Sequence, residues 1–193
     1  MVVTQPYSNV YSFTNVLSLE QFILLSEEFD SRYSHWRMNK AESSNVDCNN
    51  PMRGSLSKPL REGTQDSRTL GDNLQLIKIG SFIKMHTERV LKKKLHMYRI
   101  NTNIQLYGMP SEFHLDGDLG SWTFLLFCQD TWNSEWGGEF VMKDVDDIYK
   151  YFAYIPNNGV LFPAYLQHKG NEPNRLCHLP RLSIAFSFSE CVV

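Results

Sequence analysis

The second half of the chain alternates short apolar segments with turns, and this alternation constrains its fold most strongly. Each segment is rich in aromatic or β-branched residues and ends near a cluster of Gly, Asn or Pro, a pattern typical of β-strands. The sequence therefore predicts an all-β body. Its expected strands cover residues 97–107, 122–128, 139–143, 151–155, 159–162 and 182–188.

The first half of the chain predicts two helices that support this body. Ser18 and Gln21 have the spacing of a capping box at the start of an apolar helical pattern, which predicts a helix over 18–32. Residues 39–66 are polar and rich in Ser, Asn, Pro and Gly, so we expect a long loop; loops of this length are often lids, and this role is left open. A second helix is predicted over 70–95. Its expected inner positions are Leu74, Ile77, Phe82, Val90 and Leu91.

At 193 residues, the chain is expected to be one domain, with helical support and loop in 1–96 and a β core in 97–189. An aromatic content of 13% suits a β-rich body. The four cysteines are widely spaced and form no CxxC pair, so idle thiols are expected rather than a zinc site or disulfide framework.

The charge balance argues against a nucleic-acid partner. Nineteen Lys and Arg against 21 Asp and Glu give a net charge of −2, and Lys92 to Lys94 are interpreted as a solvated cap at a helix end. Residues 1–17 lack a basic start and a long apolar run, and no later segment predicts a membrane span. The expected location is the cytoplasm.

One ordered set of residues carries metal chemistry. His114 and Asp116 are two residues apart, so on a strand their side chains point to the same face. With His168 they make two imidazoles and one carboxylate, the facial triad of non-haem Fe(II) oxygenases. Arg181 follows in the last predicted strand and can bind a carboxylate through two hydrogen bonds, with Ser183 adding a hydroxyl.

With this set, residues 101–189 resemble the Fe(II)- and 2-oxoglutarate-dependent dioxygenase superfamily, in its prolyl 4-hydroxylase-like branch. The resemblance implies a double-stranded β-helix, the jelly roll of cupin-like proteins. Other residues that carry it are Tyr107-Gly108, Thr123 to Phe127, Trp132, Trp136-Gly137-Gly138-Glu139-Phe140 and the Pro156-x-x-Gly159 turn into Leu161-Phe162.

The resemblance implies a role for each of these polar residues. His114, Asp116 and His168 would bind Fe(II), and Arg181, assisted by Ser183, would bind the distal carboxylate of the cosubstrate 2-oxoglutarate. Dioxygen is the other cosubstrate, with ascorbate as an optional reductant. Halogenases of this superfamily replace the carboxylate ligand with a small residue, so Asp116 favours hydroxylation.

A second contact to 2-oxoglutarate is less direct. Many prolyl hydroxylase-like proteins carry a tyrosine at the position of Phe127, which has no hydroxyl. Tyr107, Asn103 and Gln105 precede the His114 motif and can supply a polar group instead; Tyr107 is ranked first.

Several functions remain open at this point. The leading prediction is hydroxylation of a peptidyl proline, and the first alternative is a free amino acid or other small metabolite. A nucleic-acid demethylase is disfavoured by charge. The alternative outside the enzymes is a metal-binding cupin-like module without catalytic activity. The oligomeric state is left open.

The remaining polar and aromatic candidates are expected to be turn, surface, packing or pocket-wall residues. They are Asp118, His35, His86, His96, His178, Trp122, Trp132 and Trp136.

Overall fold

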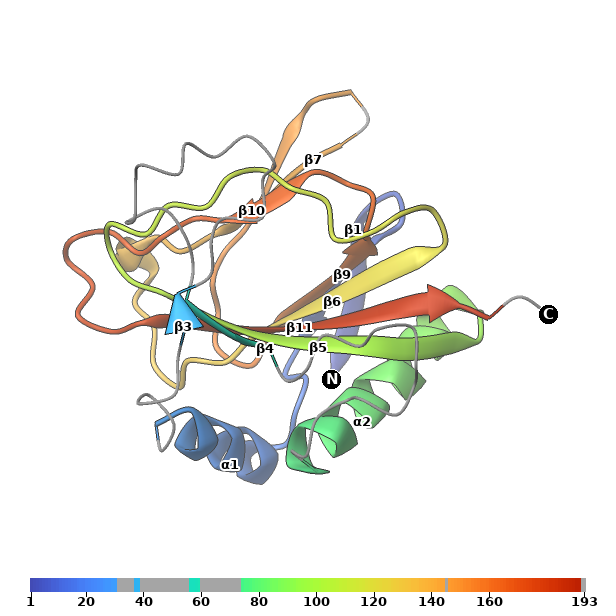
Figure 1. The fold of residues 1–193 in the computed structure, drawn as a ribbon, viewed down its shortest axis with the longest axis horizontal. Coiled ribbons are helices and arrows are strands. Elements are labelled where there is room, and N and C mark those ends of the chain that lie inside the picture. The colour runs from blue at the N-terminus through green and yellow to red at the C-terminus, as the bar shows by residue number, and fades with distance from the viewer. Residues whose placement is uncertain (31–36, 39–55, 60–73, 145, 192–193) are drawn as a thin grey trace.

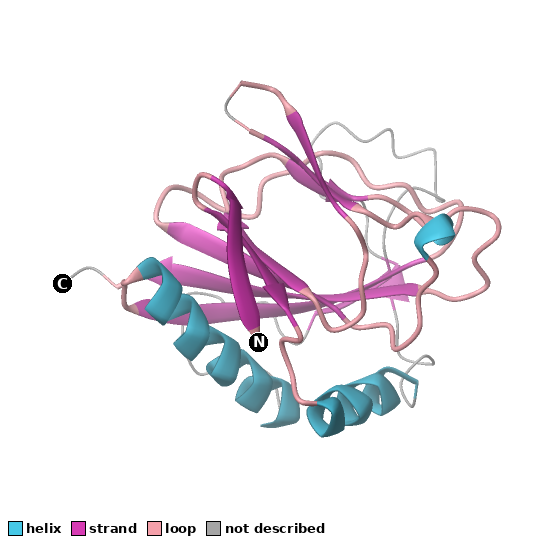
Figure 2. Ribbon diagram, turned by 180° about the vertical axis from the view of Figure 1, so that it is seen from behind, coloured by secondary structure: helices cyan, strands magenta, loops and turns pink. Residues whose placement is uncertain are grey.

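Two antiparallel sheets form the body of the protein, and two helices lie against the outer face of the larger sheet (Figure 1). The structure is a computed structural model that describes residues 1–30, 37–38, 56–59, 74–144 and 146–191. Seen from behind, both helices lie on the side of the large sheet that faces away from the smaller one (Figure 2). No helix in these ranges is long and apolar enough to cross a membrane.

The chain crosses between the two sheets several times after β5. Strands β5, β6, β9 and β11 belong to the large sheet, whereas β7, β8 and β10 form the small one. This arrangement is the double-stranded β-helix expected from the sequence, and all six predicted strands are present with shifted ends. The large sheet contains, in spatial order, β1 (Val2–Tyr7), β2 (Val10–Thr14), β9 (Gly159–Pro163), β6 (Ser121–Phe127), β11 (Arg181–Glu190), β5 (Leu95–Gln105), β4 (Leu56–Pro59) and β3 (Arg37–Met38). The small sheet contains β10 (His168–Gly170), β7 (Phe140–Lys143) and β8 (Tyr149–Phe152).

Alternation along the strands gives the large sheet two buried faces. On β6 and β11, Leu126, Ile184 and Phe186 belong to the core beneath the helices. Their neighbours Leu125 and Ala185 belong to a second core, shared with the small sheet. Because side chains on a strand alternate between faces, every second residue of β5, β6 and β11 points into the space between the sheets.

Helix α1 (Leu19–Asp30) begins at the predicted capping box. The Gln21 amide donates to Ser18 Oγ at 3.2 Å, and the Ser18 amide donates to Gln21 Oε1 at 3.1 Å. These two bonds satisfy amides at the helix start that lack a partner within the helix. The first predicted helix is therefore confirmed.

Helix α2 (Leu74–Leu91) is shorter than predicted. It ends at Leu91 because Lys92 adopts a positive φ of 55° and β5 begins three residues later. Its buried face is also displaced from the predicted one. Leu74 is 71% exposed, while Leu76, Ile79 and Ile83 carry the packing against the large sheet. The prediction that Leu74 is an inner position was wrong, because the helical period alone does not determine how the helix is rotated about its axis.

The sequence patterns predicted neither the β1–β2 hairpin, nor β4, nor the short strands β3 and β10. The hairpin of β1 and β2 extends the large sheet at one edge, and most residues of β1 are exposed, so it carries no inward-facing apolar pattern. Residues 56–59, within the predicted loop, form β4 and pair with β5. The loop prediction is therefore wrong for these residues. Residues 39–55 and 60–66, for which a role as a lid was left open, lie outside the described residues.

Candidate active site

Antiparallel pairing brings the two histidines of the predicted triad together. His114 and His168 form an isolated bridge in which each amide donates to the other's carbonyl at 3.0 Å. Their rings consequently lie side by side, with centroids 4.5 Å apart. Asp116 follows on the same segment as His114, held where its amide donates to the Ala164 carbonyl at 2.9 Å.

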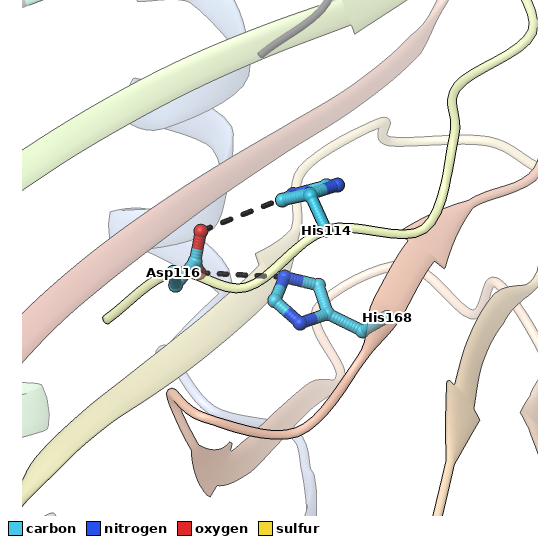
Figure 3. Close-up of side chains that lie close together, drawn as sticks. All are labelled: His114, Asp116 and His168. Carbon is cyan, nitrogen blue, oxygen red and sulfur yellow. Dashed lines mark ion pairs between the residues drawn. The ribbon is translucent and has the colours of Figure 1, made fainter. Parts of the chain in front are cut away.

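All three side chains converge on one point (Figure 3). Asp116 Oδ1 lies 3.9 Å from His114 Nε2, and Asp116 Oδ2 lies 3.5 Å from His168 Nε2. One potential ligand atom from each residue lies within 4.8 Å of the others, and the group can hold a metal ion. Two imidazoles and one carboxylate suit a divalent first-row metal and leave coordination positions open.

Backbone carbonyls orient both imidazoles for binding through Nε2. His114 Nδ1 lies 3.0 Å from the Glu112 carbonyl, and His168 Nδ1 lies 2.8 Å from the Leu166 carbonyl. A carbonyl oxygen can only accept, so each contact requires the proton on Nδ1 and places the lone pair of a neutral ring on Nε2. This is the form in which histidine binds a metal.

Asp116 is kept ionised by its surroundings. Burial acts to raise the pKa of its carboxyl group, but His168 and His114 in their protonated form, which is present before a metal binds, and the Arg99 cation outweigh burial and hold the pKa well below its usual value. Thr123 Oγ1 donates to Asp116 Oδ2 at 2.8 Å, and Arg99 Nη2 lies 3.4 Å from Oδ1. The carboxylate is therefore charged and fixed in direction.

Replacement of Thr123 by Val tests the support of this carboxylate. The change removes one hydroxyl while keeping the shape of the side chain, and we expect about tenfold weaker binding of a divalent metal. Thr87→Val is the matched control, because Thr87 is fully buried and its hydroxyl has no partner among the described residues. Calorimetric titration with Co(II) measures both variants. Equal affinities would show that Thr123 does not support Asp116.

Arg181 is buried at the start of β11 with a neutral set of partners. Its exposure is 2%, Nε donates to the Gly138 carbonyl at 2.7 Å, and Nη1 donates to Gln105 Oε1 at 3.0 Å. Ser183 Oγ lies 3.4 Å from Nη1. The buried Nη2 has no hydrogen-bond partner within the described chain. A buried cation with an unused donor is costly, and a carboxylate would satisfy it.

Two glycines allow the chain to approach Arg181 closely. Gly138 has a φ of 81°, and a Cβ there would lie 2.8 Å from the Trp132 ring. A Cβ at Gly170 would lie 2.9 Å from Arg181 Nη1. The predicted Gly137-Gly138 motif therefore has a physical role, because it directs the Gly138 carbonyl at the guanidinium.

One strand face connects Arg181 with the metal cluster. Arg181, Ser183, Ala185 and Ser187 occupy alternate positions on β11, so they share its inner face. Arg99 Nε donates to Ser187 Oγ at 3.2 Å, and Arg99 in turn contacts Asp116. The guanidinium of Arg181 and the contacts that lead to Asp116 therefore lie on the same face of β11.

The structure separates the three candidates for a second cosubstrate contact. Tyr107 lies in the turn after β5 and is 62% exposed, so its side chain is at the surface. Gln105 is 3% exposed and contacts Arg181 directly. Asn103 is half-buried on β5, opposite Ser183 of β11. Gln105 and Asn103 are thus better placed than Tyr107 to assist Arg181.

Aromatic rings form the wall beside Arg181. Its guanidinium carbon lies 5.2 Å from the Tyr154 ring centroid and 5.9 Å from that of Phe127. The Tyr154 hydroxyl donates to the Leu182 carbonyl, and burial raises the pKa of this phenol. Trp132 packs on Tyr154 at 4.4 Å and donates to the Gly137 carbonyl at 3.0 Å, so it is a wall residue as expected.

Most of the remaining candidates have local structural roles. Asp118 is exposed, and its carbonyl accepts from the Ser121 amide, as in a turn. Trp122 donates to Glu190, and Trp136 packs edge-on against His178. His86 packs against Phe82, and His96 is exposed. The described cysteines, Cys128, Cys177 and Cys191, are free thiols, while Cys48 and His35 lie outside the described residues.

Arg99, Thr123 and Tyr154 contact the site residues but had no predicted role in the site. Arg99 and Thr123 are polar residues at inward-facing positions of strands, and that position was the available signal. This signal was missed because the sequence does not show which of the two alternating sets of side chains on a strand faces inward. Tyr154 follows β8 and had no motif to mark it.

Comparison with known proteins identifies the fold. No family model matches the chain, and no curated protein sequence matches it significantly. Solved structures do. A prolyl-4-hydroxylase from Pseudomonas putida superposes with a TM-score of 0.67 at 16% identity, over 95% of this chain and 94% of that one. The chain has the fold of the 2-oxoglutarate- and Fe(II)-dependent oxygenases.

Two further oxygenase structures support this assignment of the fold. An oxidoreductase of the 2OG-Fe(II) oxygenase family from Burkholderia pseudomallei has a TM-score of 0.69 at 10% identity, over 94% of this chain and 85% of that one. A prolyl hydroxylase from Trichoplax adhaerens, in complex with a hypoxia inducible factor peptide fragment, has a TM-score of 0.66 at 16% identity, over 94% and 84%. The fold expected from the resemblance is thus confirmed.

Proposed function

We propose that this protein is an Fe(II)- and 2-oxoglutarate-dependent dioxygenase that hydroxylates an aliphatic C–H bond. The observation that carries the proposal is a pair of complementary sites in one oxygenase fold. The His114, Asp116 and His168 cluster can hold a metal, and Arg181 offers a buried donor for which the described residues provide no partner. The same inner face of β11 joins the two sites.

The residues present fit Fe(II). Both imidazoles direct Nε2 inward, and Asp116 is ionised and held by Thr123. Three protein ligands leave room for a bidentate cosubstrate and dioxygen, which is the requirement of this chemistry. Asp116 also distinguishes the site from a halogenase, which needs the carboxylate position for its halide.

The surroundings of Arg181 fit one end of 2-oxoglutarate. Nη2 is the available charged donor, and Ser183 Oγ adds a hydroxyl within 3.4 Å of Nη1. Gln105 and Gly138 hold the guanidinium in place, so little side-chain entropy is lost when a carboxylate binds. Phe127 and Tyr154 exclude water from this end.

In the proposed reaction, the iron and 2-oxoglutarate supply the oxidising chemistry: one oxygen atom of O2 enters the substrate as a hydroxyl, and the other enters succinate as CO2 is released. The protein contributes positioning. The triad would hold the metal, Arg181 would set the direction of the dicarboxylate, and the two sheets would exclude bulk water. Ascorbate would act as a reductant that restores Fe(II).

Two substrate classes are supported by different observations. Peptidyl proline is the first candidate, because two solved structures with this fold are prolyl hydroxylases, one of them with a bound peptide. A free amino acid or other small metabolite is the second, and the cationic Arg99 beside Asp116 favours it. The cytoplasmic location and the absence of a nucleic-acid substrate stay predictions.

An anaerobic titration tests the proposed function. Addition of Fe(II) and then 2-oxoglutarate to the purified protein is expected to produce a visible metal-to-ligand charge-transfer band. Its absence at saturating concentrations would contradict the dioxygenase assignment and favour a metal-binding module. After admission of air, succinate formation is measured with proline-containing peptides and with free amino acids. The class that stimulates succinate formation identifies the substrate type.

A further inference from the structure

Arg99 is a cation on the inner face of β5, beside the carboxylate of the metal cluster. Its Nε donates to Ser187 Oγ at 3.2 Å, and Nη2 lies 3.4 Å from Asp116 Oδ1. The Arg99 side chain is 25% exposed, compared with 9% for Asp116. The Arg99 side chain thus contacts the metal cluster and is partly exposed to solvent, so a small molecule can reach it.

Asp116 is the ionic partner of Arg99 among the described residues, and it is also the carboxylate of the metal cluster. A divalent cation at the cluster would draw the charge of Asp116 toward itself and would repel Arg99. The other described hydrogen-bond partner of Arg99 is the neutral Ser187 hydroxyl. Metal binding therefore leaves a partly buried guanidinium in need of an anion.

We propose that Arg99 binds a carboxylate of the substrate, and that the substrate is a small carboxylic acid such as a free amino acid. The inference rests on the proposed function, because it uses the metal bound by Asp116. A guanidinium presents parallel N–H donors that match a carboxylate. A substrate held in this way has its carboxylate beside Asp116 and its neighbouring carbons beside the metal.

A neutral reacting residue fits this place less well. Peptidyl proline carries no charge at the residue to be oxidised, so it would leave Arg99 without an anion next to a divalent metal. Arg181 cannot bind the substrate carboxylate instead, because it is 2% exposed and is assigned to the cosubstrate. The two arginines thus divide between two anions: the buried one takes 2-oxoglutarate, and the accessible one takes the substrate.

A paramagnetic probe tests this assignment without turnover. The protein is loaded with Mn(II) and N-oxalylglycine, an unreactive 2-oxoglutarate analogue, and bound Mn(II) is counted by electron paramagnetic resonance. Broadening of the methyl proton signal is then measured for acetate and for its neutral counterpart acetamide. In the wild type, we expect acetate to be broadened about tenfold more per bound Mn(II), corresponding to about 1.4 kcal/mol.

Three variants locate the anion. Arg99→Gln is expected to remove the difference between acetate and acetamide, and Arg99→Lys to restore part of it. Arg89→Gln, an equal change of charge on the exposed face of α2, is expected to leave it unchanged. An Arg99→Gln protein that still distinguishes acetate from acetamide would overturn the proposal, because acetate would then be bound by the metal alone.

Other outcomes separate this inference from the proposed function. Failure to bind Mn(II) would contradict the metal site and hence the dioxygenase assignment. Normal Mn(II) binding without preferential broadening of acetate would overturn the role of Arg99 and leave the dioxygenase assignment intact. An amidated proline peptide offers a further test. If it stimulates succinate formation equally in the wild type and in Arg99→Gln, the substrate is a peptide and the proposed role of Arg99 is also overturned.

Discussion

Replacement of Asp116 by Ala is expected to abolish 2-oxoglutarate turnover. The change removes the anionic member of the metal cluster and leaves His114, His168 and Arg99 without their common partner. Loss of a buried charged partner costs about 4 kcal/mol, which corresponds to about a thousandfold in rate or metal affinity. Succinate formation and calorimetric Fe(II) titration under anaerobic conditions measure the two effects.

Asp118→Ala is the matched control for this change. Asp118 lies two residues further along but is exposed and serves a turn through its backbone. We expect the metal affinity of the Asp118→Ala variant to equal that of the wild type. Asp116→Asn keeps the shape of the side chain while removing its charge, so it separates loss of ligation from loss of folding. Near-normal metal binding by Asp116→Asn would contradict the assignment of Asp116 as a ligand.

Replacement of Arg181 by Ala is expected to raise the KM for 2-oxoglutarate about a hundredfold, equivalent to about 2.8 kcal/mol. The physical reason is loss of the charged donor Nη2, for which the described residues provide no partner. Metal affinity should change far less, because Arg181 is not one of the three residues of the metal cluster. Initial rates against 2-oxoglutarate concentration and Fe(II) titrations measure the two quantities separately.

The exposed Arg175, changed to Ala, controls for charge loss near the same end of the chain. Arg181→Lys retains a cation and fills part of the space, so it is expected to recover part of the affinity for 2-oxoglutarate even if the Ala variant is unstable. An unchanged KM in both Arg181 variants would show that another residue binds the distal carboxylate.

Charge in this protein is arranged locally rather than globally. The net charge of −2 indicates no general affinity for anions. Within the β-helix, however, Arg181 and Arg99 occupy inward-facing positions on adjacent strands, one deeply buried and one accessible. Composition cannot predict this arrangement, because it depends on which faces of the strands point inward and on which strands lie next to each other.

The sequence by itself determined the kind of site and most of the strands that build it. His114, Asp116, His168 and Arg181 were predicted from residue type, from their order in the chain and from the resemblance to the dioxygenase superfamily, and the first three form one cluster in the structure. The strands were recognisable because alternating and aromatic segments are separated by turn residues. The helix start at Ser18 was recognisable because its capping bonds are local.

Only the tertiary structure decided what surrounds those residues. Gln105 rather than Tyr107 contacts Arg181, Arg99 and Thr123 hold Asp116, and β4 pairs with β5 within a predicted loop. Each of these facts depends on strand phase, helix rotation or pairing between segments far apart in the chain. A shift of one residue in a strand reverses the face of every side chain, so such contacts follow from the packed register.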